Sequence, residues 1–105
     1  WIWFIFPQLA ILGRSANAKF YGISSLNEAK AYISHPILGA RLREITAALL
    51  QHRGKDAVSI LGGIDAMKVR SCMTLFDAAS PNDIFHEVLD AFYDGNRDKY
   101  TLHYM

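Results

Sequence analysis

The segment from Pro36 to about Arg53 constrains the fold more than any other part of this sequence. Apolar side chains recur in it every three or four residues, at Ile37, Leu38, Leu42, Ile45, Leu49 and Leu50. This spacing is typical of an amphipathic α-helix that buries one side against other elements. Pro36 suits the first position of such a helix, and Gly54 suits the position just beyond its end.

Capping residues and short apolar repeats predict further helices on both sides of this segment. Ser25-Leu26-Asn27-Glu28 is a capping box, and it predicts a helix over Leu26–Ser34 that buries Leu26, Ala29, Tyr32 and Ile33. A short helix is expected over Asp56–Leu61, before Gly62-Gly63. From Ile64 to about Ala78 we expect a helix with Met67, Cys72, Leu75 and Phe76 inward.

The last predicted helix begins at Ser80-Pro81-Asn82-Asp83, which offers a cap, a proline for the first turn and an acidic residue. It carries Ile84, Phe85, Val88, Leu89, Phe92 and Tyr93 and ends at Asp94-Gly95-Asn96. The segment Thr101–Met105 gives no clear signal. The sequence therefore predicts an all-α fold, a compact single domain over residues 1–105 with about five to six short helices.

Composition excludes several classes of protein. The formal net charge is +1, which is far from the strongly basic balance of a nucleic-acid-binding domain. Cys72 is the only cysteine, so neither an intrachain disulfide nor a cysteine-based metal site can form, and a cytoplasmic setting is expected. The four histidines show no metal-binding spacing, and no phosphate-binding glycine loop is present, so we expect no metal and no cofactor.

The first thirteen residues are strongly apolar, yet they match no membrane or export signal. The run from Trp1 to Gly13 is shorter than the roughly 20 residues that span a bilayer, and it lacks the basic start of a signal peptide. Its aromatic side chains are expected in the core. Trp3 and Gln8 also carry polar groups, so they are candidates for the wall of a pocket.

One helix face in the second half of the chain groups reactive side chains. Asp65, Lys68 and Cys72 follow one another at intervals of three and four residues, which places them on the same side of a helix. A lysine beside a thiol or hydroxyl can activate it as a nucleophile. The alternative is an Asp65–Lys68 surface ion pair, with Cys72 as a small buried apolar residue.

Taken together, these segments resemble the domain-of-unknown-function 1810 family. The match rests on Trp1 to Gln8, Gly13-Arg14-Ser15, Tyr21-Gly22-Ile23, Glu28 to Tyr32, His35 to Gly39, Arg41-Leu42, Gly63 to Lys68, Ser71 to Phe76, and Asp98 with Thr101-Leu102. The resemblance implies an all-helical, bacterial-type domain without a known function. It also implies a further helix and a histidine before Trp1, so we expect this chain to be truncated at its N-terminus. Cys72 stands where the family commonly has a second serine.

Two functional hypotheses follow, and whether the protein is an enzyme stays open. The first is a pocket for a small anionic ligand, nucleotide-like or similar to ADP-ribose, by analogy with helical domains that process ADP-ribose derivatives. Its expected lining is Trp3, Gln8, His35, Arg41, Asp65, Lys68, Ser71 and Thr74. The second is a protein-interaction domain without catalytic activity. A truncated start would also expose apolar side chains at Ile2, Trp3 and Phe6, through which two copies could pair.

Overall fold

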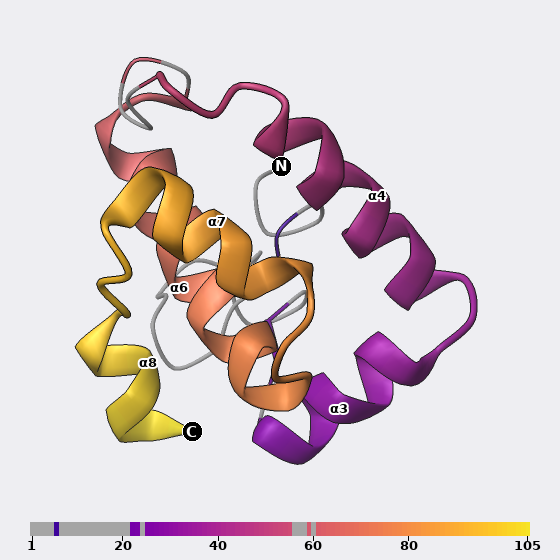
Figure 1. Cartoon of the computed structure of the whole chain (residues 1–105). Coiled ribbons are helices and arrows are strands. Elements are labelled where there is room, and N and C mark those ends of the chain that lie inside the picture. Colours follow the sequence, from indigo (N-terminus) through magenta and orange to yellow (C-terminus); the bar gives the residue numbers. More distant parts are fainter. Residues whose placement is uncertain (1–5, 7–21, 24, 56–58, 60) are drawn as a thin grey trace.

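The computed structural model describes residues 6, 22–23, 25–55, 59 and 61–105. This part of the chain contains five helices, shown in Figure 1: α3 (Leu26–Ser34), α4 (Leu38–Leu50), α6 (Gly63–Ala79), α7 (Ile84–Tyr93) and α8 (Lys99–Tyr104). The predicted all-α class is confirmed, and α3 has the predicted bounds. The predicted helix over residues 56–61 falls mostly outside the described residues, as do Trp1, Ile2, Trp3 and Gln8.

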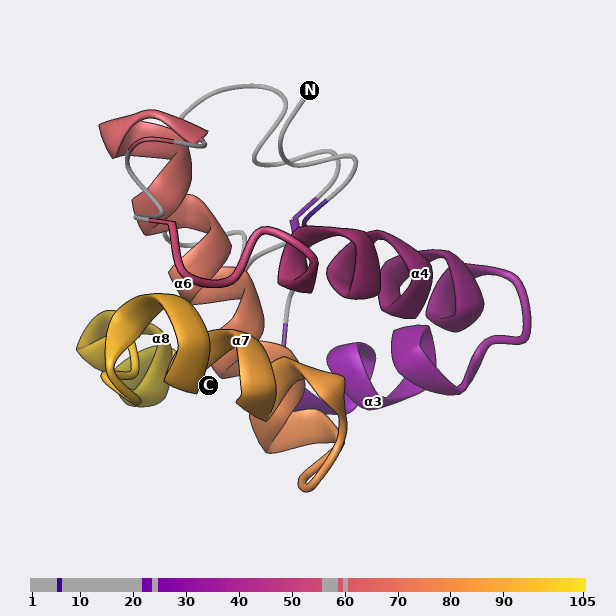
Figure 2. The ribbon, with the colours of Figure 1, turned by 45° about the horizontal axis from the view of Figure 1, so that its top comes forward.

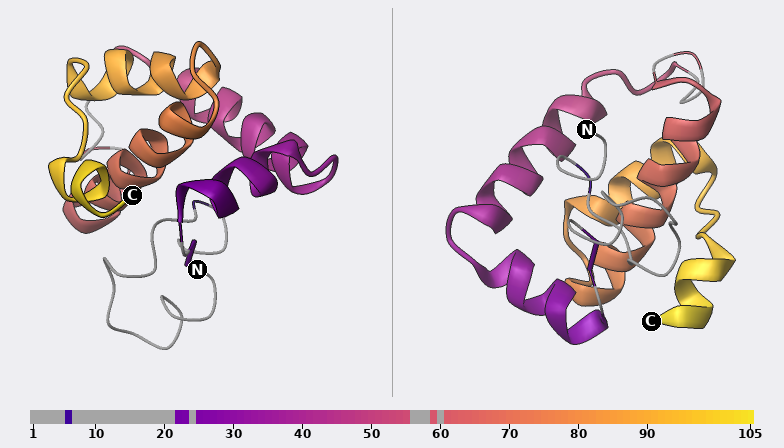
Figure 3. Two further views of the ribbon diagram at one scale, coloured as in Figure 1. Left: turned by 90° about the horizontal axis from the view of Figure 1, so that it is seen from below. Right: turned by 180° about the vertical axis from the view of Figure 1, so that it is seen from behind.

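Helix α6 is the centre of the arrangement, since it packs against α3, α7 and α8. Helices α3 and α4 follow each other through a short turn and lie side by side (Figure 2). Helix α7 packs against both α4 and α6. Seen from below and from behind, α8 and the C-terminus lie on the side of α6 away from α4 (Figure 3). Helices α3 and α7 therefore each pack against both α4 and α6.

The turn between α3 and α4 is longer than the sequence predicts, because residues 35–37 all lie in it. Pro36 lies in this turn, and α4 begins at Leu38 because Nδ1 of His35 accepts hydrogen bonds from the Ile37 and Leu38 amides, at 3.1 and 3.2 Å. The two helices approach so closely at Gly39 that a Cβ atom there would collide with the carbonyl oxygen of Ile33. A glycine is therefore required at this crossing.

The helix ends differ from the predictions where local hydrogen bonds compete. Helix α4 ends at Leu50 rather than Arg53, because the amides of residues 51–53 bond three residues back and tighten the chain into turns. The cap of α7 is Asp83, whose carboxylate accepts from the Ile84 amide at 2.7 Å, so Ser80 does not begin this helix. Ser80 instead donates to Asp83 at 2.9 Å.

The fully buried core comes mainly from α6 and α7. Rings of Tyr32, Phe76 and Phe85 follow one another across it, with centroids 5.5 and 5.7 Å apart. Phe6 is also buried, at 5% exposure, so it contributes nothing to an exposed N-terminal face. Four side chains that were predicted to point inward are instead exposed, because none of the described helices covers them: Ile37, Leu38, Ile45 and Met67.

Candidate functional site

Helix α6 carries four of the predicted site residues, and they divide into two pairs. Asp65 and Lys68 are half-buried on its first turns, whereas Ser71 and Thr74 are buried. Asp65 and Lys68 form no ion pair with each other, so the surface pair that was the alternative interpretation is absent. Lys68 makes no side-chain hydrogen bond or ion pair with any residue that the structure describes.

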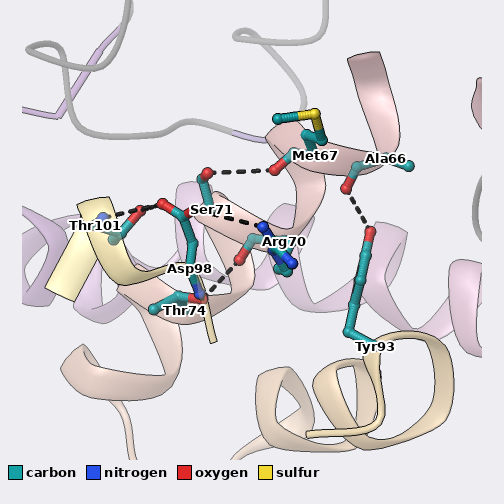
Figure 4. A network of polar contacts seen from close by, with 8 residues as sticks. All are labelled: Ala66, Met67, Arg70, Ser71, Thr74, Tyr93, Asp98 and Thr101. Carbon is teal, nitrogen blue, oxygen red and sulfur yellow. Dashed lines mark hydrogen bonds and ion pairs between the residues drawn. The ribbon is translucent and has the colours of Figure 1, made fainter. Parts of the chain in front are cut away.

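The hydroxyl groups of Ser71 and Thr74 both donate hydrogen bonds within the protein. Ser71 donates to the carbonyl of Met67 at 3.2 Å, and Thr74 donates to the carbonyl of Arg70 at 2.8 Å. Thr74 also accepts from the amide of Asp98 at 2.9 Å, which fastens the start of α8 to α6 (Figure 4). Neither hydroxyl has a proton left to donate to a ligand.

Cys72 does not have the properties of an activated nucleophile. Its thiol is fully buried, and burial raises its pKa well above the ordinary value. A reactive cysteine needs a lowered pKa and access to solvent. The structure therefore contradicts the activated-thiol hypothesis and agrees with a small apolar core residue at this position.

The two predicted residues between α3 and α4 have different surroundings. The exposed His35 is engaged as the cap of α4, and an Nδ1 that accepts two amide hydrogens places the ring proton on Nε2. Arg41 is exposed on the first turns of α4, and its guanidinium makes no hydrogen bond or ion pair with the described residues. Trp3 and Gln8 lie outside the part of the chain that the structure describes.

Tyr32 contacts Phe76 of α6 with its ring and is influenced electrostatically by Arg41. The sequence predicts it only as a core residue. Burial raises the pKa of its hydroxyl, the nearby Cys72 thiol raises it further, and the Arg41 guanidinium opposes the rise. The Arg41 guanidinium of α4 and the Cys72 thiol of α6 therefore both act electrostatically on this hydroxyl. Lys68 precedes Cys72 by one helical turn on the same side of α6. We call Tyr32, Arg41, Lys68 and Cys72 the α3–α4–α6 junction.

A second polar cluster lies on another side of α6. Asp98 caps α8 by accepting from the Thr101 amide at 2.9 Å and from the Thr101 hydroxyl at 2.6 Å. Arg70 faces the same carboxylate, with Nη2 3.7 Å from Oδ1 (Figure 4). Across from it, the Tyr93 hydroxyl donates to the carbonyl of Ala66 at 2.6 Å. The signal for this cluster in the sequence was Asp98 three residues before Thr101, the spacing of a helix cap.

Two open grooves on the described surface lie away from the predicted site residues. One shallow groove of about 470 Å³ runs between the end of α4 and α7, lined by Ala47, Leu50, Gln51, Arg53, Ile84 and Glu87. A neighbouring groove shares Arg53 and Glu87 with it. Neither includes a predicted residue. Both grooves are wide open to solvent.

Within the described ranges, no three histidine, cysteine or carboxylate side chains come together as metal ligands would. The same part of the chain holds no helix with the length and apolar content needed to cross a membrane.

Comparison with known proteins yields a family and one solved structure. The model of a family described as "Protein of unknown function (DUF1810)" matches residues 1–105. The crystal structure of the conserved hypothetical protein Rv1873 from Mycobacterium tuberculosis is similar to this chain, with 45% sequence identity and a TM-score of 0.94. The match covers 98% of this chain and 74% of the mycobacterial one. No curated protein matches this sequence.

Proposed function

The chain belongs to the DUF1810 family of proteins of unknown function, and from its own geometry we propose that it binds a small anionic molecule at the α3–α4–α6 junction. The observation that carries the proposal is that Arg41 and Lys68 have no carboxylate partner among the described residues. Arg41 also acts electrostatically on the protonated Tyr32 hydroxyl.

The chemistry of this group suits an anion. A guanidinium presents a planar set of donors that matches a phosphate or carboxylate, and an ammonium adds a second, more mobile charge. Because the pKa of Tyr32 is raised, its hydroxyl keeps its proton at neutral pH and can donate to an anionic oxygen. The junction therefore offers donors and positive charge, and its buried thiol contributes no negative charge.

The ligand class follows from the number of cationic side chains and from the two helices that carry them. Arg41 comes from α4 and Lys68 from α6, so a ligand that engages both must extend from one helix to the other. A nucleotide, with phosphates joined to a sugar and a base, has this extent and more than one negative charge. ADP-ribose is the first member of the class to test, and Trp3 and Gln8 remain proposed parts of the wall. The single cysteine, unpaired, suits a cytoplasmic setting for this binding.

A thermal-shift screen tests the proposal. The panel contains ADP-ribose, AMP, NAD, ribose 5-phosphate and, as a neutral control, ribose. A ligand at 100 times its dissociation constant adds about 2.7 kcal/mol to the free energy of unfolding, which is easily measured in a domain of this size. The substitutions R41Q and K68Q should each reduce the shift. R53Q, which replaces an exposed arginine in the turns that follow α4, should leave it unchanged.

The outcomes separate the proposal from its alternatives. If no member of the panel shifts the melting temperature, or if R53Q weakens binding as much as R41Q does, then the junction is not the site. Retention of the full shift in R41Q and K68Q would place the ligand elsewhere on the protein.

A protein-interaction function is the second candidate, and a separate surface favours it. Ile64 and Met67 on the first turns of α6 are 72% and 63% exposed, which is unusual for large apolar side chains on one face of a helix. If this surface binds another protein, replacing both residues with serine should leave ligand-induced shifts intact while abolishing any concentration-dependent association seen by light scattering. A wild-type chain that stays monomeric at all concentrations would remove self-association as the interaction.

A further inference from the structure

The side of α4 that points away from the core carries apolar side chains that no described helix covers. Ile37, at the start of the helix, is 56% exposed, and Leu38 and Ile45 are 37% and 38% exposed. The buried side chains of α4, among them Leu42 and Thr46, lie on the opposite side. Helices α3 and α7 pack against α4, which itself lies at the edge of the molecule (Figure 1). We call the uncovered side the outer face of α4.

Two charges without partners lie along the middle of the outer face. Arg41 and Glu44 are exposed, and neither makes a hydrogen bond or an ion pair with a described residue. Together with Ile37 and Ala48 they follow one another at intervals of four, three and four residues. This is the spacing of the contact line between two helices of a coiled coil. The outer face therefore has the pattern of a surface that pairs with another helix.

The pattern is complementary to itself when a second copy of α4 runs antiparallel to the first. With the two-fold axis level with the midpoint of residues 42 and 43, Arg41 of each copy faces Glu44 of the other. In the same register Ile37 of each copy faces Ala48 of the other, so a large apolar side chain meets a small one. A parallel pair in register would instead bring Arg41 against Arg41 and Glu44 against Glu44, which is destabilising. Charge complementarity therefore selects the antiparallel pair.

The two flanks of the contact line also match. A two-fold axis perpendicular to both helices brings the same flank of the two copies together. On one flank Leu38 lies next to Ile45 of the other copy, so that these exposed apolar side chains cover each other. On the other flank Ala40 lies next to Ala47 of the other copy, and such small side chains let the helices approach closely. Each of these residues thus meets one of matching charge or size.

We propose that two copies of this chain associate through the outer face of α4 as a symmetric antiparallel dimer. Helix α4 has 13 residues and is therefore about 20 Å long. One helix pair of this length buries less than the roughly 1,600 Å² of a standard interface, so the dimer dissociates readily. The pairing of Arg41 with Glu44 fixes the register at some cost in stability. A carboxylate engages two of the five donors of a guanidinium, so Arg41 keeps donors for a ligand, and the dimer does not depend on that ligand.

Sedimentation equilibrium of the full chain over a range of concentrations tests the dimer. The wild type should show a reversible monomer–dimer equilibrium with a dissociation constant below about 1 mM. E44R places four cations at the centre of the pair, so it should raise this constant at least about tenfold. R41E/E44R exchanges the two charges and restores their complementarity, so its dissociation constant should return to near the wild-type value.

Two control variants locate the interface. K99E reverses an exposed charge on α8, and I64S/M67S changes the exposed apolar surface at the start of α6, so both should associate as the wild type does. Circular dichroism verifies that each variant is folded. The proposal is overturned if the wild type stays monomeric up to about 1 mM, if E44R associates as the wild type does, or if R41E/E44R fails to restore association. Loss of association in I64S/M67S alone would place the interface on α6. None of these results affects the junction, where ligand binding is read from the thermal shifts of R41Q and K68Q.

Discussion

Replacing Gly39 with alanine should destabilise this protein, although helix propensity alone predicts the opposite. Within a helix, alanine is favoured over glycine by about 1 kcal/mol. The added Cβ would, however, meet the backbone carbonyl of Ile33 at the end of α3, and it would also lie 3.2 Å from Nη1 of Arg43. A backbone atom cannot rotate away, so the two helices must separate.

The size of the effect follows from these opposing contributions. Overpacking of this kind costs about 3 kcal/mol at the upper end of its usual range, and the gain in propensity offsets about 1 kcal/mol of that. Separation of the helices would also weaken the hydrogen bond from Arg43 to the Ile33 carbonyl. We expect a net loss of about 2 kcal/mol, or a fall of about 9 °C in the melting temperature for a domain of this length.

Urea denaturation followed by circular dichroism measures this loss, and Gly63 provides the control. Gly63 is the first residue of α6 and has no atom within 4 Å of an added Cβ, so G63A should be neutral or slightly stabilising. The midpoint of G39A should fall with the slope unchanged. If G39A is as stable as G63A, then the reasoning about the α3–α4 crossing is wrong.

Three further predictions concern buried and charged groups. The buried Cys72 thiol, whose pKa is raised, should react with a thiol reagent at pH 8 only as fast as the protein unfolds, and rapid labelling of native protein would contradict this. Thr101→Val removes a donor to the Asp98 carboxylate and should lower the free energy of unfolding by about 2 kcal/mol. Thr46→Val removes a hydrogen bond to the neutral carbonyl of Leu42 and should lower it by about 1 kcal/mol. Equal losses of the two variants in urea denaturation would refute this distinction. Burial raises the pKa of Asp83, but hydrogen bonds from the Ile84 amide and from the Arg43 and Ser80 side chains outweigh it, and the pKa is lowered overall. Asp83 therefore stabilises the fold fully above the ordinary aspartate pKa of about 3.9, and the pH-dependent part of the stability difference between wild type and D83N should be lost as the pH falls from that value through the lowered pKa of Asp83.

The position of α3 could be predicted from the sequence because its first turn carries a capping box. The bounds of α3 agree with the structure because Ser25 accepts from the Glu28 amide, as the capping box predicts. Helix α4 begins at Leu38 rather than at Pro36, since the His35 ring accepts from the Ile37 and Leu38 amides, and α7 is capped by Asp83 rather than by Ser80. The residues of α8 show no apolar pattern in the sequence. Its start is fixed by a hydrogen bond from the Asp98 amide to Thr74 of α6, a residue distant in sequence.

The candidate site could be predicted only in part, for a similar reason. Spacing along α6 correctly grouped Lys68 with Cys72 on one side of the helix, but it could not show that the Ser71 and Thr74 hydroxyls bond to their own helix. The approach of Tyr32 to Arg41 depends on how α3 packs against its neighbours. The burial of Arg70 beside Asp98 depends likewise on a contact between α6 and α8.

The central claim is that an anionic ligand binds at the junction of α3, α4 and α6. Its most direct test is an NMR titration with ADP-ribose that follows the ring signals of Tyr32 and the Nε–Hε signal of Arg41 together. We predict that both move saturably with one dissociation constant, and that the corresponding signal of Arg53 stays in place. Saturable binding of ADP-ribose that leaves Tyr32 and Arg41 unperturbed would contradict the claim.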